Sequence, residues 1–135
     1  MKKVQVDFWQ VTVPEFWNIE SEVEMTSMYD PDGMGTLVIS SVVEDEVIGD
    51  DYIEDLVIEH LDAGAELHHE VFGPFTGVGC CFEADDEYWC EWYLCHENML
   101  LFVTYNCDLE SEGEEDDLIE SILDSLTLAK NSKLH

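Results

Sequence analysis

The chain has 135 residues, of which 46% are hydrophobic and 11% aromatic, a size and composition that suit one folded domain with a substantial core. It carries 33 acidic residues against 4 basic ones, which gives a formal net charge of -29 at pH 7. Such a polyanion repels nucleic acid and anionic lipid and attracts positively charged proteins or ions. The aromatic content also excludes the class of acidic disordered proteins. We therefore expect a single domain spanning residues 1–135.

The four basic residues all lie near the ends of the chain: Lys2, Lys3, Lys130 and Lys133. Arginine is absent, so the acidic residues between these lysines have no internal lysine or arginine with which to pair. An almost wholly anionic surface follows. We expect its partner to be a basic protein, and we expect binding of neither nucleic acid nor a membrane.

The compartment is predicted from the N-terminus and the cysteines. Asp7 and Gln10 interrupt the apolar run that a secretory signal would need, and no stretch approaches the length of a membrane span. The five cysteines are odd in number and irregularly spaced, which is typical of free thiols in a reducing compartment rather than of a disulfide framework. These features predict a cytoplasmic protein, most simply a bacterial one.

Alternation of apolar and polar residues predicts strands in the first third of the chain. The first covers residues 8–13 and ends at Pro14, because proline has no N–H to donate to a ladder. Residues 22–29 and 34–43 form the next two strands. The segment between them, residues 30–33, has the sequence Asp-Pro-Asp-Gly, which is typical of a turn, so these two strands should form a hairpin.

Two segments have apolar residues at the three- and four-residue spacing of a helix, namely residues 51–63 and 114–126. Near the start of each lies a pair of residues with the spacing of a capping box: Asp51 with Glu54, and Ser111 with Glu114. Gly64 suits the position just after the first helix. Each helix has one apolar stripe and needs a sheet on which to lie.

The clearest hairpin joins residues 88–95 to residues 99–107 through a turn near residues 97–98. A two-residue loop would pair Cys95 with Leu100. One face of the pair is then largely apolar: Tyr88, Cys90, Trp92 and Leu94 beside Leu101, Val103, Tyr105 and Cys107. The opposite face is only half apolar, so we expect it to be half covered.

The fold class follows from these elements together. Residues 66–72 and 78–84 are predicted as two further strands upstream of the clearest hairpin. No repeat or long linker divides the chain. The sequence therefore predicts an α+β fold in which an antiparallel sheet lies between helical layers.

The cysteine and histidine residues raise the question of a metal or catalytic site. None forms the C-x-x-C pairs typical of structural zinc, and neighbours in a strand such as Cys80 and Cys81 point to opposite faces. The chain also lacks a G-x-S-x-G elbow, a P-loop and a dinucleotide fingerprint. We expect no metal, no cofactor and no catalytic residue. A thiol- or metal-dependent enzyme, such as one with a cysteine nucleophile assisted by His68 or His69, is the alternative.

Acidic residues beside aromatic ones predict a protein-binding surface. Trp89 and Tyr93, if partly exposed, would be its aromatic anchors, and its acidic rim would be formed by neighbouring carboxylates: Asp85, Asp86, Glu87 and Glu91. The first predicted helix adds three acidic residues at four-residue spacing: Asp51, Asp55 and Glu59. Like charges at this spacing lower helix stability by about 0.2–0.5 kcal/mol each. Their retention favours a role for the charge in binding.

Several short motifs follow one another along nearly the whole chain: Val13-Pro14-Glu15-Phe16-Trp17, Gly35-Thr36-Leu37-Val38-Ile39-Ser40, Leu101-Phe102-Val103-Thr104-Tyr105 and Ser125-Leu126. In this order they resemble the Mog1/PsbP-like family, whose bacterial members include small domains without an assigned function. The resemblance implies an α/β/α sandwich. It also implies binding rather than catalysis, because members act as GTPase adaptors or photosystem subunits, and related bacterial domains are chaperones for secreted toxins.

We therefore expect a non-enzymatic acidic protein that docks a basic protein partner, in the manner of an immunity protein, an adaptor or a chaperone. The partner could be a toxin or a secreted effector. Besides the enzyme considered above, one further alternative is open. A chain of this charge can act as a mimic of nucleic acid and occupy a DNA- or RNA-binding protein.

Overall fold

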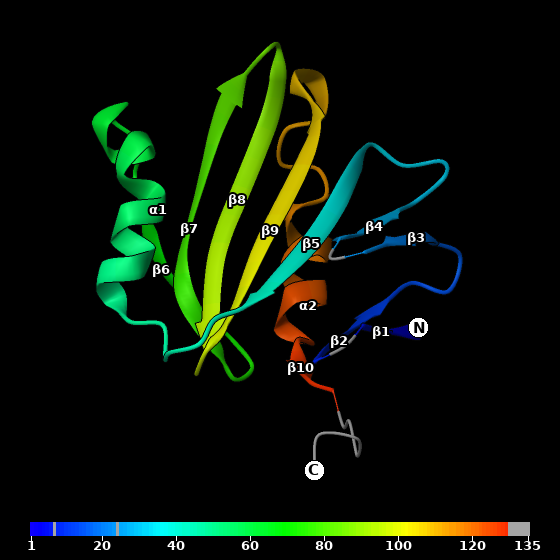
Figure 1. Cartoon of the computed structure of the whole chain (residues 1–135). Helices are drawn as coiled ribbons and strands as arrows, with labels where there is room; N and C mark the ends of the chain where they lie inside the picture. Colours follow the sequence, from blue (N-terminus) through cyan, green and yellow to red (C-terminus); the bar gives the residue numbers. More distant parts are fainter. Residues whose placement is uncertain (7, 24, 130–135) are drawn as a thin grey trace.

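The computed structural model describes residues 1–6, 8–23 and 25–129, and its central element is a seven-stranded antiparallel sheet (Figure 1). The strand order is β3-β4-β5-β9-β8-β7-β6. In chain order the strands are β3 (Asn18–Glu22), β4 (Met25–Tyr29), β5 (Gly35–Val43), β6 (His68–Phe72), β7 (Phe75–Ala84), β8 (Glu87–His96) and β9 (Met99–Asp108). Hairpins join β3 to β4, β4 to β5, β6 to β7, β7 to β8 and β8 to β9.

The remaining elements cover the two faces of this sheet. They are β1 (Lys2–Val6), β2 (Trp9–Val13), α1 (Asp50–Asp62), the 3-10 turn η1 (Leu109–Ser111), α2 (Asp116–Asp124) and β10 (Thr127–Leu128). The strands β1, β2 and β10 form a small second sheet, which together with α2 covers one face, and α1 covers the other (Figure 1). None of the described helices is both long and apolar enough to cross a membrane.

The predicted antiparallel sheet is confirmed, whereas the predicted helical layers hold only in part. The molecule is mostly antiparallel strand with two helices, and the helix α2 shares its layer with the small sheet. Each face of the large sheet therefore packs against a different kind of layer. Mog1/PsbP-like α/β/α packing describes this arrangement loosely.

The register predicted for the clearest hairpin is confirmed, since Cys95 pairs with Leu100. Leu94, Leu101 and Val103, on the face predicted to be core, are all 0% exposed. They belong to a large cluster that also includes Trp9 and Trp17 and lies between the sheet and the α2 layer. Alternation along β8 and β9 thus decides which layer each side chain faces.

A smaller cluster lies on the opposite face, beneath α1. Its buried members are Ile48, Ile53, Val57, Tyr93 and Leu100. Two of these residues, Ile53 and Val57, are four positions apart on α1, so one stripe of the helix meets the sheet. The other faces of α1 are left to the acidic residues.

The helix positions were predicted to within two residues, but both predicted capping boxes are wrong. The N-cap residues are Gly49 for α1 and Glu115 for α2, and neither makes a side-chain cap hydrogen bond. Ser111 lies instead in η1, so α2 begins after an extra turn. Gly64 follows α1 with φ of 88°, the left-handed conformation expected at that position.

The first predicted hairpin is also present. β4 lies inside the predicted range 22–29, although Glu24 is outside the described residues. The turn after it is closed by the backbone N–H of Gly33, which donates to the carbonyl of Asp30 at 2.8 Å. The Asp30 side chain also accepts from the backbone N–H of Asp32 at 2.8 Å. Aspartate at the first position of a turn stabilises it in this way.

Candidate protein-binding surface

The tip of the β7–β8 hairpin consists of two aspartates. Asp85 and Asp86 have φ of 54° and 64° and connect the closing pair Ala84 and Glu87. Two successive residues with positive φ form the turn that matches the twist of a hairpin, and aspartate tolerates this conformation better than most residues. Both side chains are exposed, so the tip of this hairpin carries two solvent-accessible carboxylates.

Trp89 lies behind this tip on the face of the sheet that also carries α1. It pairs across the strands with Phe82, and both rings are half-buried. The indole Nε1 of Trp89 is buried and has no hydrogen-bond partner among the described residues. Part of the Trp89 side chain is therefore accessible near the carboxylates of the tip.

The side chains of Glu91, Tyr93 and His60 form a cluster between β8 and α1. The His60 Nε2 lies 2.8 Å from the Glu91 Oε1, and the Tyr93 hydroxyl donates to the same oxygen at 2.9 Å. The Tyr93 hydroxyl is also 3.4 Å from the His60 Nε2. Burial, reinforced by the charge and hydrogen bond of Glu91, raises the pKa of Tyr93 far above its usual value, so the hydroxyl remains a donor.

This cluster corrects one expectation. Tyr93 is only 8% exposed, because α1 packs over it, so it is not an exposed aromatic anchor. Glu91 is also largely covered, with 16% of its side chain exposed. Both residues attach α1 to the sheet, and their contribution to a surface is indirect.

The acidic residues of the predicted site differ in their exposure and in their hydrogen bonds. Glu87 is half-buried and accepts a hydrogen bond from the Asn106 Nδ2 at 2.6 Å. The three acidic residues of α1, Asp51, Asp55 and Glu59, are exposed. Asp51 lies nine residues before His60, about 13 Å along the helix axis, so the predicted residues form a band rather than one compact patch.

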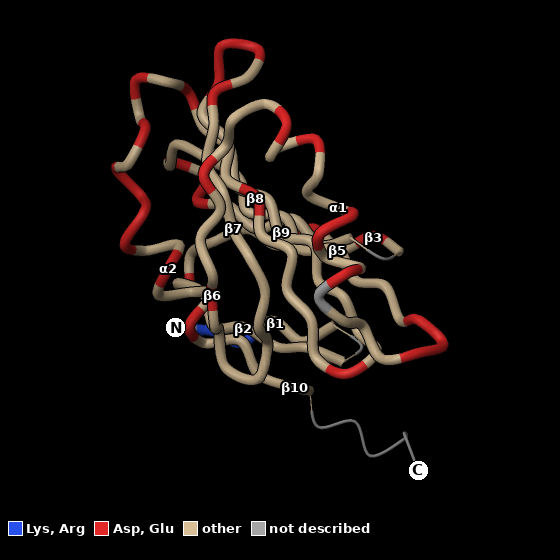
Figure 2. Tube along the Cα trace, turned by 90° about the vertical axis from the view of Figure 1, so that its left-hand side faces the viewer, with Lys and Arg blue, Asp and Glu red and all other residues tan. Residues whose placement is uncertain are grey.

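Few of these charges are neutralised within the fold. Figure 2 shows acidic residues in the loops and helices around the molecule, with the described lysines confined to the N-terminal end. The Nζ of Lys2 donates to the backbone carbonyl of Trp17 at 2.6 Å. Among the described residues the ion pairs use the N-terminal amine or a histidine: Met1 with Glu15, His60 with Glu91, and His96 with Glu97. Lys130 and Lys133 lie outside the described residues.

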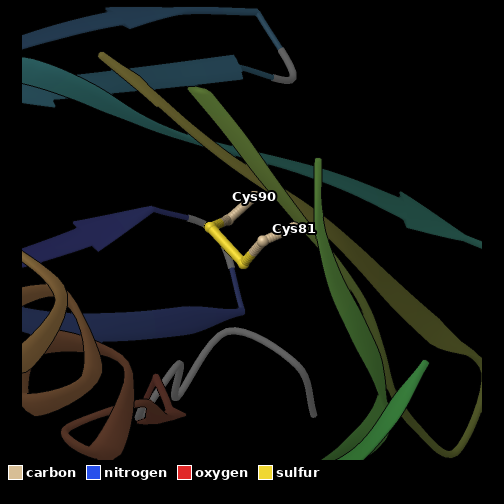
Figure 3. The surroundings of a disulfide bond; sticks show 2 residues. All are labelled: Cys81 and Cys90. Atoms are coloured by element: carbon tan, nitrogen blue, oxygen red, sulfur yellow. A yellow bond between two sulfur atoms is a disulfide. The ribbon is translucent and has the colours of Figure 1, made fainter. Parts of the chain in front are cut away.

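A disulfide joins Cys81 of β7 to Cys90 of β8 (Figure 3). The expectation of free thiols is wrong for this pair. The two residues are direct cross-strand neighbours with Cα atoms 4.1 Å apart. The two-residue turn makes Ala84 and Glu87 a hydrogen-bonded pair, and alternation then makes Cys81 and Cys90 a non-hydrogen-bonded pair, the kind in which Cα atoms come closest. This pair therefore gives no support to a reducing compartment, and the cytoplasmic location stays a prediction.

Two of the three cysteines outside the disulfide are poorly suited to act as nucleophiles. Cys80 and Cys107 are buried and outside the disulfide, and burial raises the pKa of both thiols. A raised pKa disfavours the thiolate that a nucleophile needs. His68 and His69, the predicted helpers, are exposed on β6. No described cluster of three or more His, Cys, Asp or Glu side chains has the arrangement of a metal site.

Comparison with known proteins gives matches of structure and none of sequence family. No family model and no curated protein matches the chain. A crystal structure from Bacteroides thetaiotaomicron VPI-5482 matches with a TM-score of 0.71 and 20% identity, over 96% of this chain and 49% of that one. This chain thus spans about half the length of that protein.

Two further solved structures match over most of both chains. The crystal structure of LpqN, involved in cell envelope biogenesis of Mycobacterium tuberculosis, has a TM-score of 0.61 and 14% identity, over 90% of this chain and 83% of LpqN. The solution structure of the cyanobacterial PsbP, CyanoP, from Synechocystis sp. PCC 6803 has a TM-score of 0.59 and 11% identity, over 90% of this chain and 86% of CyanoP. Identities this low speak for the fold alone. The chain has a PsbP-like fold, as its sequence resemblance implied.

Proposed function

We propose that this protein is a non-enzymatic acidic binding protein that docks a basic protein partner. The contact would be made by the hairpin surface, which we define as Asp85, Asp86, Glu87 and Trp89 with Asp51, Asp55 and Glu59 of α1, while Glu91 supports this surface from beneath α1. One observation carries the proposal. Two exposed carboxylates at a two-residue hairpin tip lie near the half-buried Trp89, and no lysine or arginine lies between residues 4 and 129 to neutralise them.

Each part of the hairpin surface has a distinct physical role in this proposal. The carboxylates of Asp85 and Asp86 attract a basic partner at long range and increase the association rate. Trp89 supplies apolar contact area, and tryptophan is among the residues that dominate binding energy. The hydrogen bonds of Glu91 with His60 and Tyr93 hold α1 in place before binding, which reduces the entropy lost on association.

The kind of partner that fits is a folded basic protein, as for an immunity protein, an adaptor or a chaperone. The compartment can be tested on the same material. Cys81 and Cys90 isolated as a disulfide from native cells would favour an oxidising compartment, and isolated as thiols they would favour the cytoplasm predicted from the sequence.

The test compares two variants of equal charge change. The first is Asp85→Asn with Asp86→Asn, which keeps the turn because asparagine also tolerates positive φ. The second is Glu110→Gln with Glu112→Gln, exposed residues in the segment before α2. Partners are captured from native host cells at low salt, identified, and then titrated against each purified protein.

We expect a basic partner whose affinity falls as salt rises, and whose association is slowed much more by the hairpin variant than by its control. Equal effects of the two variants would overturn the hairpin surface as the contact. A partner displaced by DNA in competition would favour the nucleic-acid mimic instead. Turnover of a small molecule would favour the enzyme.

A further inference from the structure

The strand β6 is an open edge of the large sheet. It ends the strand order, and on its inner side it pairs with β7 from His68 opposite Gly79 to Phe72 opposite Phe75. Within the described residues no strand pairs with its outer side. Val71 in this strand is 60% exposed. An open edge of this kind is a template for another extended segment.

The hairpin geometry tells which backbone groups of β6 are available. The pair Phe72 and Phe75 is joined by only two residues, so it exchanges backbone hydrogen bonds across the hairpin. By alternation, Glu70 and His68 also direct their amide groups to β7, whereas His69 and Val71 direct theirs outward. No backbone hydrogen bond from His69 or Val71 to another described part of the chain is present.

On one side of β6 a hollow of about 160 Å³ runs from the edge strand to α2. Three carboxylates line it, those of Glu70, Asp116 and Glu120, and none has a side-chain hydrogen bond or ion pair within the described structure. Rings of Trp92 and Tyr105 form part of the wall. Unpaired carboxylates beside aromatic faces are the surroundings that a lysine or arginine side chain prefers.

On the other side of β6 apolar and polar side chains are mixed. A second hollow of about 300 Å³ lies between α1 and β7. Its lining includes Ile53, Val78 and Cys95 together with Glu54, His69 and Thr76. The exposed Val71 side chain points to this same side, because it alternates with Glu70. A strand added beside β6 would therefore meet three carboxylates on one face, and on the other face the apolar groups of Val71, Ile53 and Val78 beside a single carboxylate, that of Glu54.

We infer that the β6 edge binds an extended basic segment as an additional strand, with its cationic side chains directed at Glu70, Asp116 and Glu120. This rests on the proposed function, because the segment belongs to the basic partner, and it names a second contact on that partner. Backbone hydrogen bonds would supply affinity, and the alternation of basic and apolar residues would supply specificity. A second copy of this chain is a poor occupant, since two chains of charge -29 repel each other.

The test uses an octapeptide of four Lys-Val repeats, acetylated and amidated, as the probe. Two N-methylated forms carry the methyl groups on all lysines or on all valines, which removes one set of backbone donors and keeps every charge. In a strand these two sets point to opposite edges, so only one set can face β6. A fourth peptide has the same composition in the order Lys-Lys-Val-Val, repeated.

The protein variants are Val71→Pro, which removes an outward N–H from the β6 edge, and Ser21→Pro at the corresponding position of the opposite edge strand β3. Affinities are measured by fluorescence at low and moderate salt, and folding is checked by circular dichroism. Amide exchange of wild-type protein is followed with and without the peptide. The peptide series on wild-type protein decides the question even if Val71→Pro does not fold.

We expect one N-methylated peptide, and only one, to lose about tenfold or more in affinity. Val71→Pro should lose binding, Ser21→Pro should keep it, and the amides of His69 and Val71 should gain protection. Equal binding of all four peptides, or no binding of the parent peptide, would overturn the inference. The inference would also be overturned if the wild-type protein formed a dimer through the β6 edge and Val71→Pro made it monomeric. The proposed function is tested independently of this inference, because the variant Asp85→Asn with Asp86→Asn changes the hairpin surface and leaves the β6 edge intact.

Discussion

Reduction of the Cys81–Cys90 disulfide should lower the free energy of unfolding by about 2.5 kcal/mol. The two cysteines are separated by 9 positions in the sequence. In the chain-entropy model, a closed loop of this length removes enough freedom from the unfolded chain to give about 2.5 kcal/mol at 25 °C. For a chain of 135 residues, this corresponds to a fall in the melting temperature of about 9 °C.

The structure makes this value an upper limit. The loop that the disulfide closes is a hairpin with a two-residue turn, and the aspartates in that turn favour a hairpin in the unfolded chain as well. A partly formed hairpin has less entropy left for the disulfide to remove. The measured loss should therefore lie between about 1 and 2.5 kcal/mol.

The assay is urea unfolding of wild-type protein with and without a reductant, beside the double variant Cys81→Ala with Cys90→Ala. Reductant should destabilise the wild type and leave the variant unchanged, and alkylation after unfolding should label two more cysteines in reduced than in oxidised wild type. The entropic reasoning would be refuted if the reductant left the free energy of unfolding of the wild type unchanged although labelling shows that the disulfide is reduced. Cys107→Ala serves as a control, because this thiol lies outside the disulfide.

Three further outcomes can be measured by thermal melts. Burial raises the pKa of Tyr93 and Tyr105 above the unfolded value of about 10. The contribution of these two neutral side chains to the stability of the fold is therefore complete below about pH 10 and is lost as the pH rises above it. With phenylalanine at both positions, the melting temperature should fall less steeply between pH 10 and 12 than that of the wild type. An equally steep fall in both proteins would contradict this. Gly73→Ala should cost more than about 1 kcal/mol, because Gly73 has φ of 61° and a Cβ there would strike the backbone carbonyl of Leu126, whereas Gly49→Ala meets nothing within 4 Å. Sodium chloride raised from 10 to about 200 mM should increase the melting temperature by screening the acidic surface, and an unchanged or lower temperature would show that self-repulsion is negligible.

The elements that sequence patterns predicted are those with long alternation or a clear helical stripe. The strands β8 and β9 were predicted in register because ten-residue alternation and a short turn both fix the same pairing. The edge strand β3, the terminal strand β1 and the two-residue β10 were missed. β3 carries two glutamates and a serine, and β1 opens with two lysines, so local composition hides pairing that is decided by neighbouring strands.

The disulfide and the burial of Tyr93 were missed for different reasons. The strands on either side of Asp85 and Asp86 were predicted, and a register counted from that turn would have placed Cys81 opposite Cys90. The burial of Tyr93 depends on where α1 packs, which involves residues about thirty positions away, such as His60. No pattern within one strand contains that information.

Two glycines illustrate how a sequence motif gains its meaning from packing. Gly77 and Gly79 are too few to form a dinucleotide fingerprint, and the structure gives another reason for them. A Cβ at Gly77 would overlap the backbone carbonyl of Tyr93, and one at Gly79 would overlap the indole of Trp92. Absence of a side chain lets the neighbouring strand approach closely at these points.

The large sheet separates two hydrophobic clusters of different size. The cluster beneath α1 has five buried members, against the much larger set on the α2 side. The sheet lies between the two clusters, so the contacts of one do not stabilise the other. Local opening of α1 should therefore cost less free energy than opening of the α2 layer. We expect the amides of α1 to exchange faster than those of α2, although the hydrogen bonds of Glu91 with His60 and Tyr93 oppose that opening. Three of the acidic residues, Asp51, Asp55 and Glu59, are therefore carried by the layer with the smaller hydrophobic cluster.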